Sequence, residues 1–90
     1  MIAPLKVNPA NFVVHEILYN LNGFSIAIGL WEDGSKRIAM RWDGEADDDN
    51  GYPKTFGHPM WFQLPLELTL PILELLDNVP TKYYRNDPNT

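Results

Sequence analysis

The sequence predicts an α+β domain, in which a curved antiparallel sheet of four strands packs one face against a C-terminal helix. Two turn signals, Asn22-Gly23 and Asp33-Gly34, separate three runs rich in apolar residues, the pattern of consecutive β-hairpins. Leucines then recur at helical spacing between residues 66 and 76. Ninety residues with 44% hydrophobic content form one domain, residues 1–90, with one modest core.

The first hairpin follows an extended lead-in at residues 1–10, which contains Pro4 and Pro9. Residues 12–21 are β-branched and aromatic, which favours a strand. A two-residue turn at Asn22-Gly23 suits a type I′ turn, because both positions need a positive φ. The expected pairs are Leu21 with Phe24, Tyr19 with Ile26, Ile17 with Ile28, and His15 with Leu30.

The second hairpin is expected to have a three-residue loop, Asp33-Gly34-Ser35. A two-residue loop at Asp33-Gly34 would place Leu30 opposite Arg37 and mix apolar with polar side chains on one face. The longer loop instead sets Leu30 opposite Ile38 and Trp31 opposite Arg37.

The second half of the chain begins with a long acidic loop, rich in glycine and proline, at residues 43–59. A fourth strand is expected at residues 60–64, with Met60, Phe62 and Leu64 facing inward. A helix is expected at about 70–77, with Thr69 as its N-cap and Pro71 in its first turn. Its apolar face is Leu66, Leu70, Leu73 and Leu76, and residues 81–90 form a flexible tail.

The two faces of the central hairpin differ in chemistry. One is expected to be the core face: Phe24, Ile26, Ile28, Leu30, Ile38, Met40 and Trp42. The other is small, cationic and aromatic: Ser25, Ala27, Gly29, Trp31, Arg37, Ala39 and Arg41. If this second face is open, its chemistry predicts a binding surface.

Single-stranded nucleic acid is the first candidate ligand for this second face. Trp31 and Trp61 would stack bases, and the basic side chains that would meet phosphates are Lys36, Arg37 and Arg41, with Lys54 from the loop. The alternative is that both tryptophans pack against the termini or a second subunit, because tryptophan is usually mostly buried.

A family resemblance supports the first candidate. The elements of this chain that carry the resemblance are strand 24–31, turn 33–34, strand 36–42, strand 60–64 and a leucine-rich helix through residue 76. Their order resembles the single-stranded-DNA-binding transcriptional coactivator fold of the positive-cofactor type. In that family the helix mediates dimerisation, and the sheet binds single strands through basic and aromatic residues. The resemblance implies these roles for Lys36, Arg37, Arg41, Trp31 and Trp61, although the family is basic where residues 43–49 are acidic.

The charge distribution favours a second class of function. The net charge is −5, and five of the twelve acidic residues lie within residues 43–49, so the remainder balances at seven acids and seven bases. An acidic protein-binding or inhibitory module would use this loop to capture a basic partner. The residues of this alternative site are Asp47, Asp48, Asp49, Tyr52 and Phe56.

Ile72, Leu75 and Val79 leave apolar surface on the helix, which indicates a homodimer.

Several chemical functions lack a motif. The chain has no cysteine, so it forms no disulfide and carries no thiol nucleophile. The acidic run fails the calcium-loop spacing, and His15 and His58 share no metal-binding motif. No Gly-x-Ser-x-Gly occurs, so we expect a non-enzymatic regulatory binding module without catalytic residues, metal or cofactor. No apolar run approaches a membrane span and no signal peptide is evident, which indicates a cytoplasmic protein and no membrane partner.

Overall fold

The computed structural model describes residues 2–45 and 49–77 and confirms the α+β fold class. Four antiparallel strands form the main sheet in the order β1-β2-β3-β6, and a second sheet pairs β4 with β5. The strands are β1 (Phe12–Leu21), β2 (Phe24–Trp31), β3 (Lys36–Trp42), β4 (Lys54–Thr55), β5 (His58–Pro59) and β6 (Phe62–Gln63). The helical elements are η1 (Pro4–Lys6), η2 (Leu66–Leu68) and α1 (Thr69–Asp77).

The first hairpin turns as predicted at Asn22 and Gly23, whose φ angles are 55° and 76°. The pairs nearest the turn, Leu21 with Phe24 and Tyr19 with Ile26, are confirmed. The two more distant pairs are wrong, because irregularities in β1 between residues 14 and 16 and between 17 and 19 each insert an extra residue. The observed partners there are Ile17 with Ala27 and Val13 with Leu30.

The second hairpin has a loop of three residues, but one position earlier than predicted, at residues 32–34. The Trp31 N–H donates to the Ser35 carbonyl at 2.9 Å, and Gly34 takes the position with positive φ, 84°. Leu30 therefore pairs with Lys36. The shift from the predicted register is two residues, and an even shift keeps every side chain on its face.

Helix α1 covers the predicted core face, but with a different set of side chains. Leu18, Ile38 and Leu76 are buried there, and Ile72 and Leu73 pack against them. The expected inward positions Leu66 and Leu70 are 48% and 68% exposed. Ile72, assigned to a dimer surface, belongs to the core instead, while Leu75 is exposed and Val79 lies outside the described residues. Among the described residues the Thr69 hydroxyl has no hydrogen-bond partner, so its predicted capping bond is absent.

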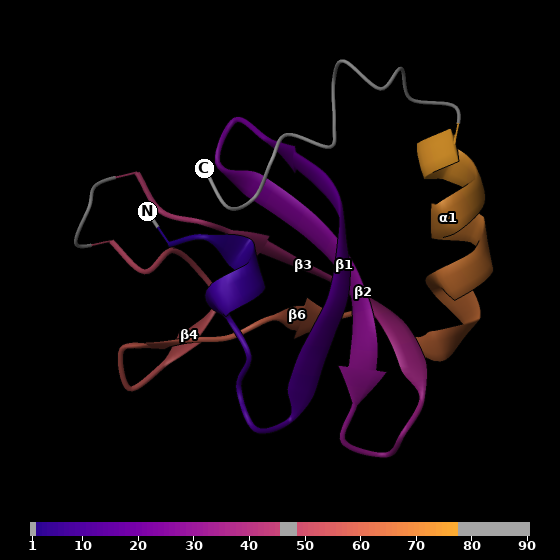
Figure 1. Ribbon diagram of the computed structural model, residues 1–90, viewed down its shortest axis with the longest axis horizontal. Helices are drawn as coiled ribbons and strands as arrows, with labels where there is room; N and C mark the ends of the chain where they lie inside the picture. Colours follow the sequence, from indigo (N-terminus) through magenta and orange to yellow (C-terminus); the bar gives the residue numbers. More distant parts are fainter. Residues whose placement is uncertain (1, 46–48, 78–90) are drawn as a thin grey trace.

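The opposite face of the sheet is also covered, so its interpretation as an open face is wrong. The residues expected to be an extended lead-in contain η1, which lies on the other side of the sheet from α1 (Figure 1). Val7, Phe12 and Trp61 form a buried cluster with one residue from each of β1, β2 and β3. These residues are Ile17, Ala27 and Ala39. Trp61 is 4% exposed, and its indole N–H donates to the Val7 carbonyl at 2.6 Å. This is the alternative in which a tryptophan packs against a terminus.

The small residues of this face make room for the aromatic rings that cover it. A Cβ at Gly29 would lie 2.2 Å from the Val13 carbonyl oxygen and 2.8 Å from the Phe12 ring. The ring centroids of Phe12 and Trp61 are 6.0 Å apart. Small side chains therefore allow close packing here instead of forming the floor of an open platform.

The segment predicted as a loop, residues 43–59, contains the β4–β5 hairpin and a bridge between Trp42 and Tyr52. The predicted fourth strand is reduced to β6, which pairs Phe62 with Met40 and Gln63 with Ala39. Phe62, expected to face inward, is 62% exposed. Within residues 2–45 and 49–77, no helix is long and apolar enough to span a bilayer.

The helix packing predicts opposite outcomes for two leucines that the sequence pattern treats alike. Leu76→Ala should lower the free energy of unfolding by about 2–5 kcal/mol, because it leaves a cavity beside Ile38. Leu70→Ala removes a largely exposed side chain and should change it by less than about 0.5 kcal/mol. Urea denaturation measures both. Equal losses would show that the packed face of α1 is assigned incorrectly.

Candidate functional site

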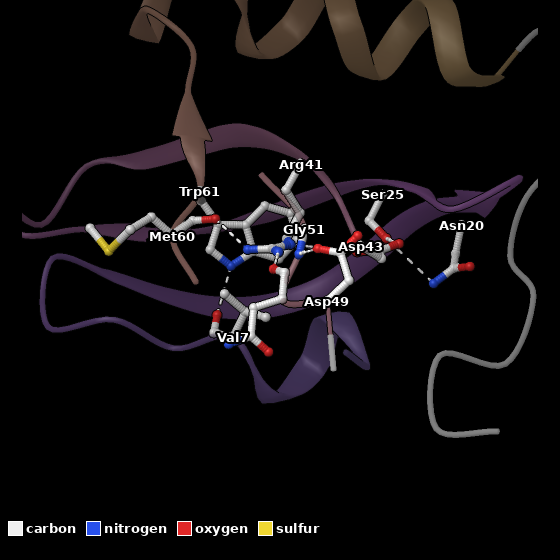
Figure 2. Close-up of polar contacts among 10 residues, drawn as sticks. Val7, Asn20, Ser25, Arg41, Asp43, Asp49, Gly51, Met60 and Trp61 are labelled. Atoms are coloured by element: carbon white, nitrogen blue, oxygen red, sulfur yellow. Dashed lines mark hydrogen bonds and ion pairs between the residues drawn. The ribbon is translucent and has the colours of Figure 1, made fainter. Parts of the chain in front are cut away.

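A buried arginine anchors the segment after β3 to the sheet. The Arg41 side chain has no exposed surface, and its guanidinium donates to the Met60 carbonyl at 2.6 Å and to the Asn50 carbonyl (Figure 2). Its Nε lies 3.6 Å from Oδ1 of Asp43, which is equally buried. One side chain thus joins β3 to three points along residues 43–60.

Asp43 completes this polar network within the fold. Its Oδ2 accepts a hydrogen bond of 2.6 Å from the Ser25 hydroxyl, and its backbone N–H donates to the Gly23 carbonyl at 2.7 Å. Burial raises the pKa of the Asp43 carboxyl, against the opposing effects of the Ser25 hydrogen bond and the Arg41 charge. Burial likewise lowers the pKa of Arg41. Both charges are therefore enclosed by the fold and are unable to contact a ligand on the surface.

A tight turn at Gly51 brings Tyr52 beside Trp42. Gly51 has a φ of 73°, and a Cβ there would lie 1.9 Å from the Trp42 carbonyl oxygen and 2.7 Å from the Arg41 guanidinium. Trp42 and Tyr52 exchange two backbone hydrogen bonds, of 2.8 and 3.0 Å. Only glycine permits this approach, and the result is a fixed pair of aromatic residues.

Trp42 and Tyr52 border an apolar depression, here called the aromatic groove. Its volume is about 200 Å³. Trp42, Tyr52 and Phe62 are 55%, 66% and 62% exposed, and the Phe24 ring packs edge-to-face on Trp42 with centroids 4.6 Å apart. The complete lining is Phe24, Met40, Arg41, Trp42, Tyr52, Pro53 and Phe62. Exposed aromatic surface in a concave site is typical of protein interfaces.

A second depression, here called the acidic cavity, shares Trp42 and Tyr52 with the aromatic groove. Its volume is about 330 Å³, and its lining includes Glu45 and Asp49. The Asp49 carboxylate accepts hydrogen bonds from the backbone N–H groups of Glu45 and Gly51, which lower the pKa of Asp49. Apolar and anionic surfaces therefore meet along one aromatic wall.

The residues proposed for nucleic-acid binding are not brought together on one open surface. Trp31 is half-buried against the cluster around Val7, and Arg37 is paired with Asp33 at 3.2 Å. Arg41 and Trp61 are buried. The remaining two, Lys36 and Lys54, are exposed.

The residues of the alternative, protein-binding site are partly brought together. Tyr52 borders both depressions, Asp49 borders the acidic cavity, and Phe56 is 98% exposed at the tip of the β4–β5 hairpin. Asp47 and Asp48 lie outside the described residues. The aromatic residues Trp42 and Phe62 were missed, because strict alternation assigned them to the core.

Element lengths carried a signal that would have identified Trp42. A helix of nine residues extends about 14 Å, whereas β2, with eight residues, extends about 26 Å. A helix this short leaves part of the sheet face uncovered. Trp42 ends β3, directly before the turn-rich acidic segment, so it was the natural candidate for the uncovered part.

Elsewhere on the described surface there is a larger depression, of about 550 Å³. It lies between the N-terminal segment and residues 58–60, where Lys6 and His58 are the ionisable residues of its lining. Within residues 2–45 and 49–77, no group of three or more histidine or acidic residues forms a metal site.

Comparisons with known proteins do not assign a function to this chain, so its function is inferred from the geometry of the candidate site. No protein-family model, curated protein or solved structure matches this chain. The resemblance to the coactivator fold therefore stays a prediction.

The Arg41 network makes a prediction about stability. Arg41→Ala should lower the free energy of unfolding by about 3–5 kcal/mol, because it leaves a buried carboxylate and two carbonyls without their partner. The matched variant Arg37→Ala breaks a partly exposed pair with Asp33 and should cost less than about 1 kcal/mol. Denaturant unfolding compares them. Similar small losses would contradict the anchoring role of Arg41.

Asp43 makes a prediction about pH. Its folded pKa is raised above 3.8, so the folded chain binds this proton more tightly than the unfolded chain. The contribution of Asp43 to stability therefore falls as the pH rises from about 3.8 through the folded pKa. Ser25→Ala removes a hydrogen bond that lowers this pKa, so the Asp43 titration should move to still higher pH.

The carboxyl-carbon NMR signals of Asp43 and Asp33 measure this change directly. The pKa of Asp33 is lowered mainly by its hydrogen bonds with Ser35, so its titration should be the same in both proteins. An Asp43 midpoint that stays the same or falls in Ser25→Ala would contradict the assignment.

Proposed function

We propose that this chain is a small non-enzymatic binding module for another protein. Its aromatic groove accepts an apolar side chain of an extended segment, and its acidic cavity accepts a neighbouring Lys or Arg side chain of the same segment. The observation that carries this proposal is the shared wall of the two depressions, formed by Trp42 and Tyr52.

The chemistry of the two depressions supports such a bipartite ligand. Burying an apolar side chain against Trp42 and Phe62 removes water from both partners. A cation held near Tyr52 is attracted by the aromatic ring and by the carboxylates of Glu45 and Asp49. The surplus of acidic residues in this part of the chain also accelerates the approach of a basic partner.

Single-stranded nucleic acid is the weaker candidate on the same observations. Two of the residues proposed to meet it, Arg41 and Trp61, are buried. Trp42 and Tyr52 offer exposed rings, but the depression beside them carries Glu45 and Asp49, which repel phosphates. The protein ligand therefore fits the described surface better.

The test selects peptides from a random display library against the full chain and measures synthetic copies by calorimetry. The selected peptides should carry an apolar residue beside Lys or Arg. Phe62→Ala should weaken binding at least tenfold, about 1.4 kcal/mol, because it removes one side of the groove. Glu45→Gln should weaken binding and reduce its salt dependence.

Matched variants separate the groove from general effects. Leu70→Ala removes another exposed apolar side chain, and Glu67→Gln removes another exposed acid. Neither residue lines the aromatic groove or the acidic cavity, so neither variant should change the affinity. Selected peptides without basic residues, or binding that Phe62→Ala leaves intact, would contradict the proposal. Quenching of tryptophan fluorescence by oligo-dT at low salt, without peptide binding, would favour the nucleic-acid alternative instead.

A further inference from the structure

Phe56 is a large apolar side chain with almost no contact to the rest of residues 2–45 and 49–77. It is 98% exposed at the tip of the β4–β5 hairpin, which lies on the side of the sheet away from α1 (Figure 1). Exposing a whole phenyl ring to water is unfavourable. Within the described part of the chain, Phe56 therefore has no packing role.

The backbone at Phe56 is strained as well. Phe56 and Gly57 have φ angles of 50° and 80°, close to the 55° and 76° of Asn22 and Gly23 at the first hairpin. Asparagine tolerates this left-handed conformation, whereas a bulky residue there is an outlier. Phe56 therefore occupies the turn position that Asn22 occupies in the first hairpin. Strain combined with full exposure indicates a function in binding.

The aromatic groove of a second copy fits the Phe56 side chain. An apolar cavity of about 150 Å³ admits a benzene ring, and the groove measures about 200 Å³. Tyr52 and Pro53, which line the groove, directly precede the β4–β5 hairpin. Only two residues separate Pro53 from Phe56, so their Cα atoms lie within about 11 Å of each other. A two-fold axis beside this segment would therefore place each Phe56 in the partner's groove.

The exposed area suffices for a weak dimer. A fully exposed aromatic side chain presents about 150–250 Å². Trp42, Tyr52, Phe56 and Phe62 are between 55% and 98% exposed, so together they offer roughly 500 Å² per copy. Two copies then bury about 1,000 Å², the lower limit for a specific interface.

The geometry points to a homodimer formed by reciprocal insertion of Phe56 into the aromatic groove of a second copy. This inference goes beyond the proposed function, and it places the dimer contact at the hairpin instead of on α1. Because the ligand and the second copy occupy the same groove, dimerisation and peptide binding exclude each other.

Opposite salt dependences distinguish the two associations. Each copy carries a net charge of −5, so two copies repel each other, and added salt should strengthen the dimer by screening this repulsion. Binding of a basic peptide should weaken with salt, because the same screening reduces an attraction.

Sedimentation of the full chain and of the variant Phe56→Asn tests the inference. The wild-type chain should dimerise with a dissociation constant on the order of 10–100 μM, as expected for an interface near the lower size limit. Phe56→Asn should stay monomeric at these concentrations. The Tm of Phe56→Asn, measured on dilute monomer, should lie about 4–8 °C above that of the wild-type chain, because asparagine relieves the strained turn. Loss of association with gain of stability separates an interface role from a folding role.

Three further measurements locate the contact. Leu75→Asn removes an exposed apolar residue of α1 and should leave dimerisation unchanged. An equimolar mixture of Phe56→Asn and Phe62→Ala should associate more tightly than Phe56→Asn alone, because one Phe56 then meets one intact groove. Phe56→Asn should also keep, or improve, its affinity for selected peptides, because its own groove is intact and free.

Other results would overturn the inference. The inference is wrong if the wild-type chain is monomeric at several hundred micromolar at physiological ionic strength. It is also wrong if Leu75→Asn dissociates the dimer and Phe56→Asn does not. Peptide binding without dimerisation would leave the proposed function standing and remove the homodimer. Dimerisation without peptide binding would have the reverse effect.

Discussion

The segment that carries the aromatic groove is held in place by the buried guanidinium of Arg41. This group is the shared partner of the Asp43 carboxylate, the Asn50 carbonyl and the Met60 carbonyl (Figure 2). A buried ion pair adds little net stability, because desolvation offsets the attraction. What Arg41 supplies is a defined path: the chain has to return to the same point of β3 at residues 43, 50 and 60, and the side chains between these points are thereby positioned.

The same path explains why both faces of a small sheet are covered. After the Met60 carbonyl contacts Arg41, the next residue, Trp61, lies beneath the N-terminal segment and donates to the Val7 carbonyl. This arrangement closes the face opposite α1. Helix α1 closes the other face only in part, because nine residues are shorter than the strands beneath them. The aromatic groove lies at the part of the sheet that neither cover reaches.

The groove combines a rigid backbone with exposed side chains, as expected of a binding surface. Trp42 and Tyr52 are joined by two backbone hydrogen bonds, and only glycine fits at position 51, between the Trp42 carbonyl and the Arg41 guanidinium. Rings held in this way lose little conformational freedom when a ligand covers them. Carboxylates on the adjacent wall then favour cationic ligands over anionic ones.

Local sequence determined the pairing of β1 with β2 and of β2 with β3, both hairpin turns to within one residue, the separation of side chains onto two faces of β2 and β3, and the final helix, because these depend on turn chemistry and residue periodicity. The exposed positions of Tyr52 and Phe56 in the turn-rich segment agree with a loop site as well. Tertiary structure alone decided which face is open. Small residues beside Trp31 and Arg41 are compatible with an open platform or with close packing, and only the position of η1 and Trp61 distinguishes these outcomes. Contacts between residues 54 positions apart, such as Trp61 with Val7, leave no periodic signal in the sequence.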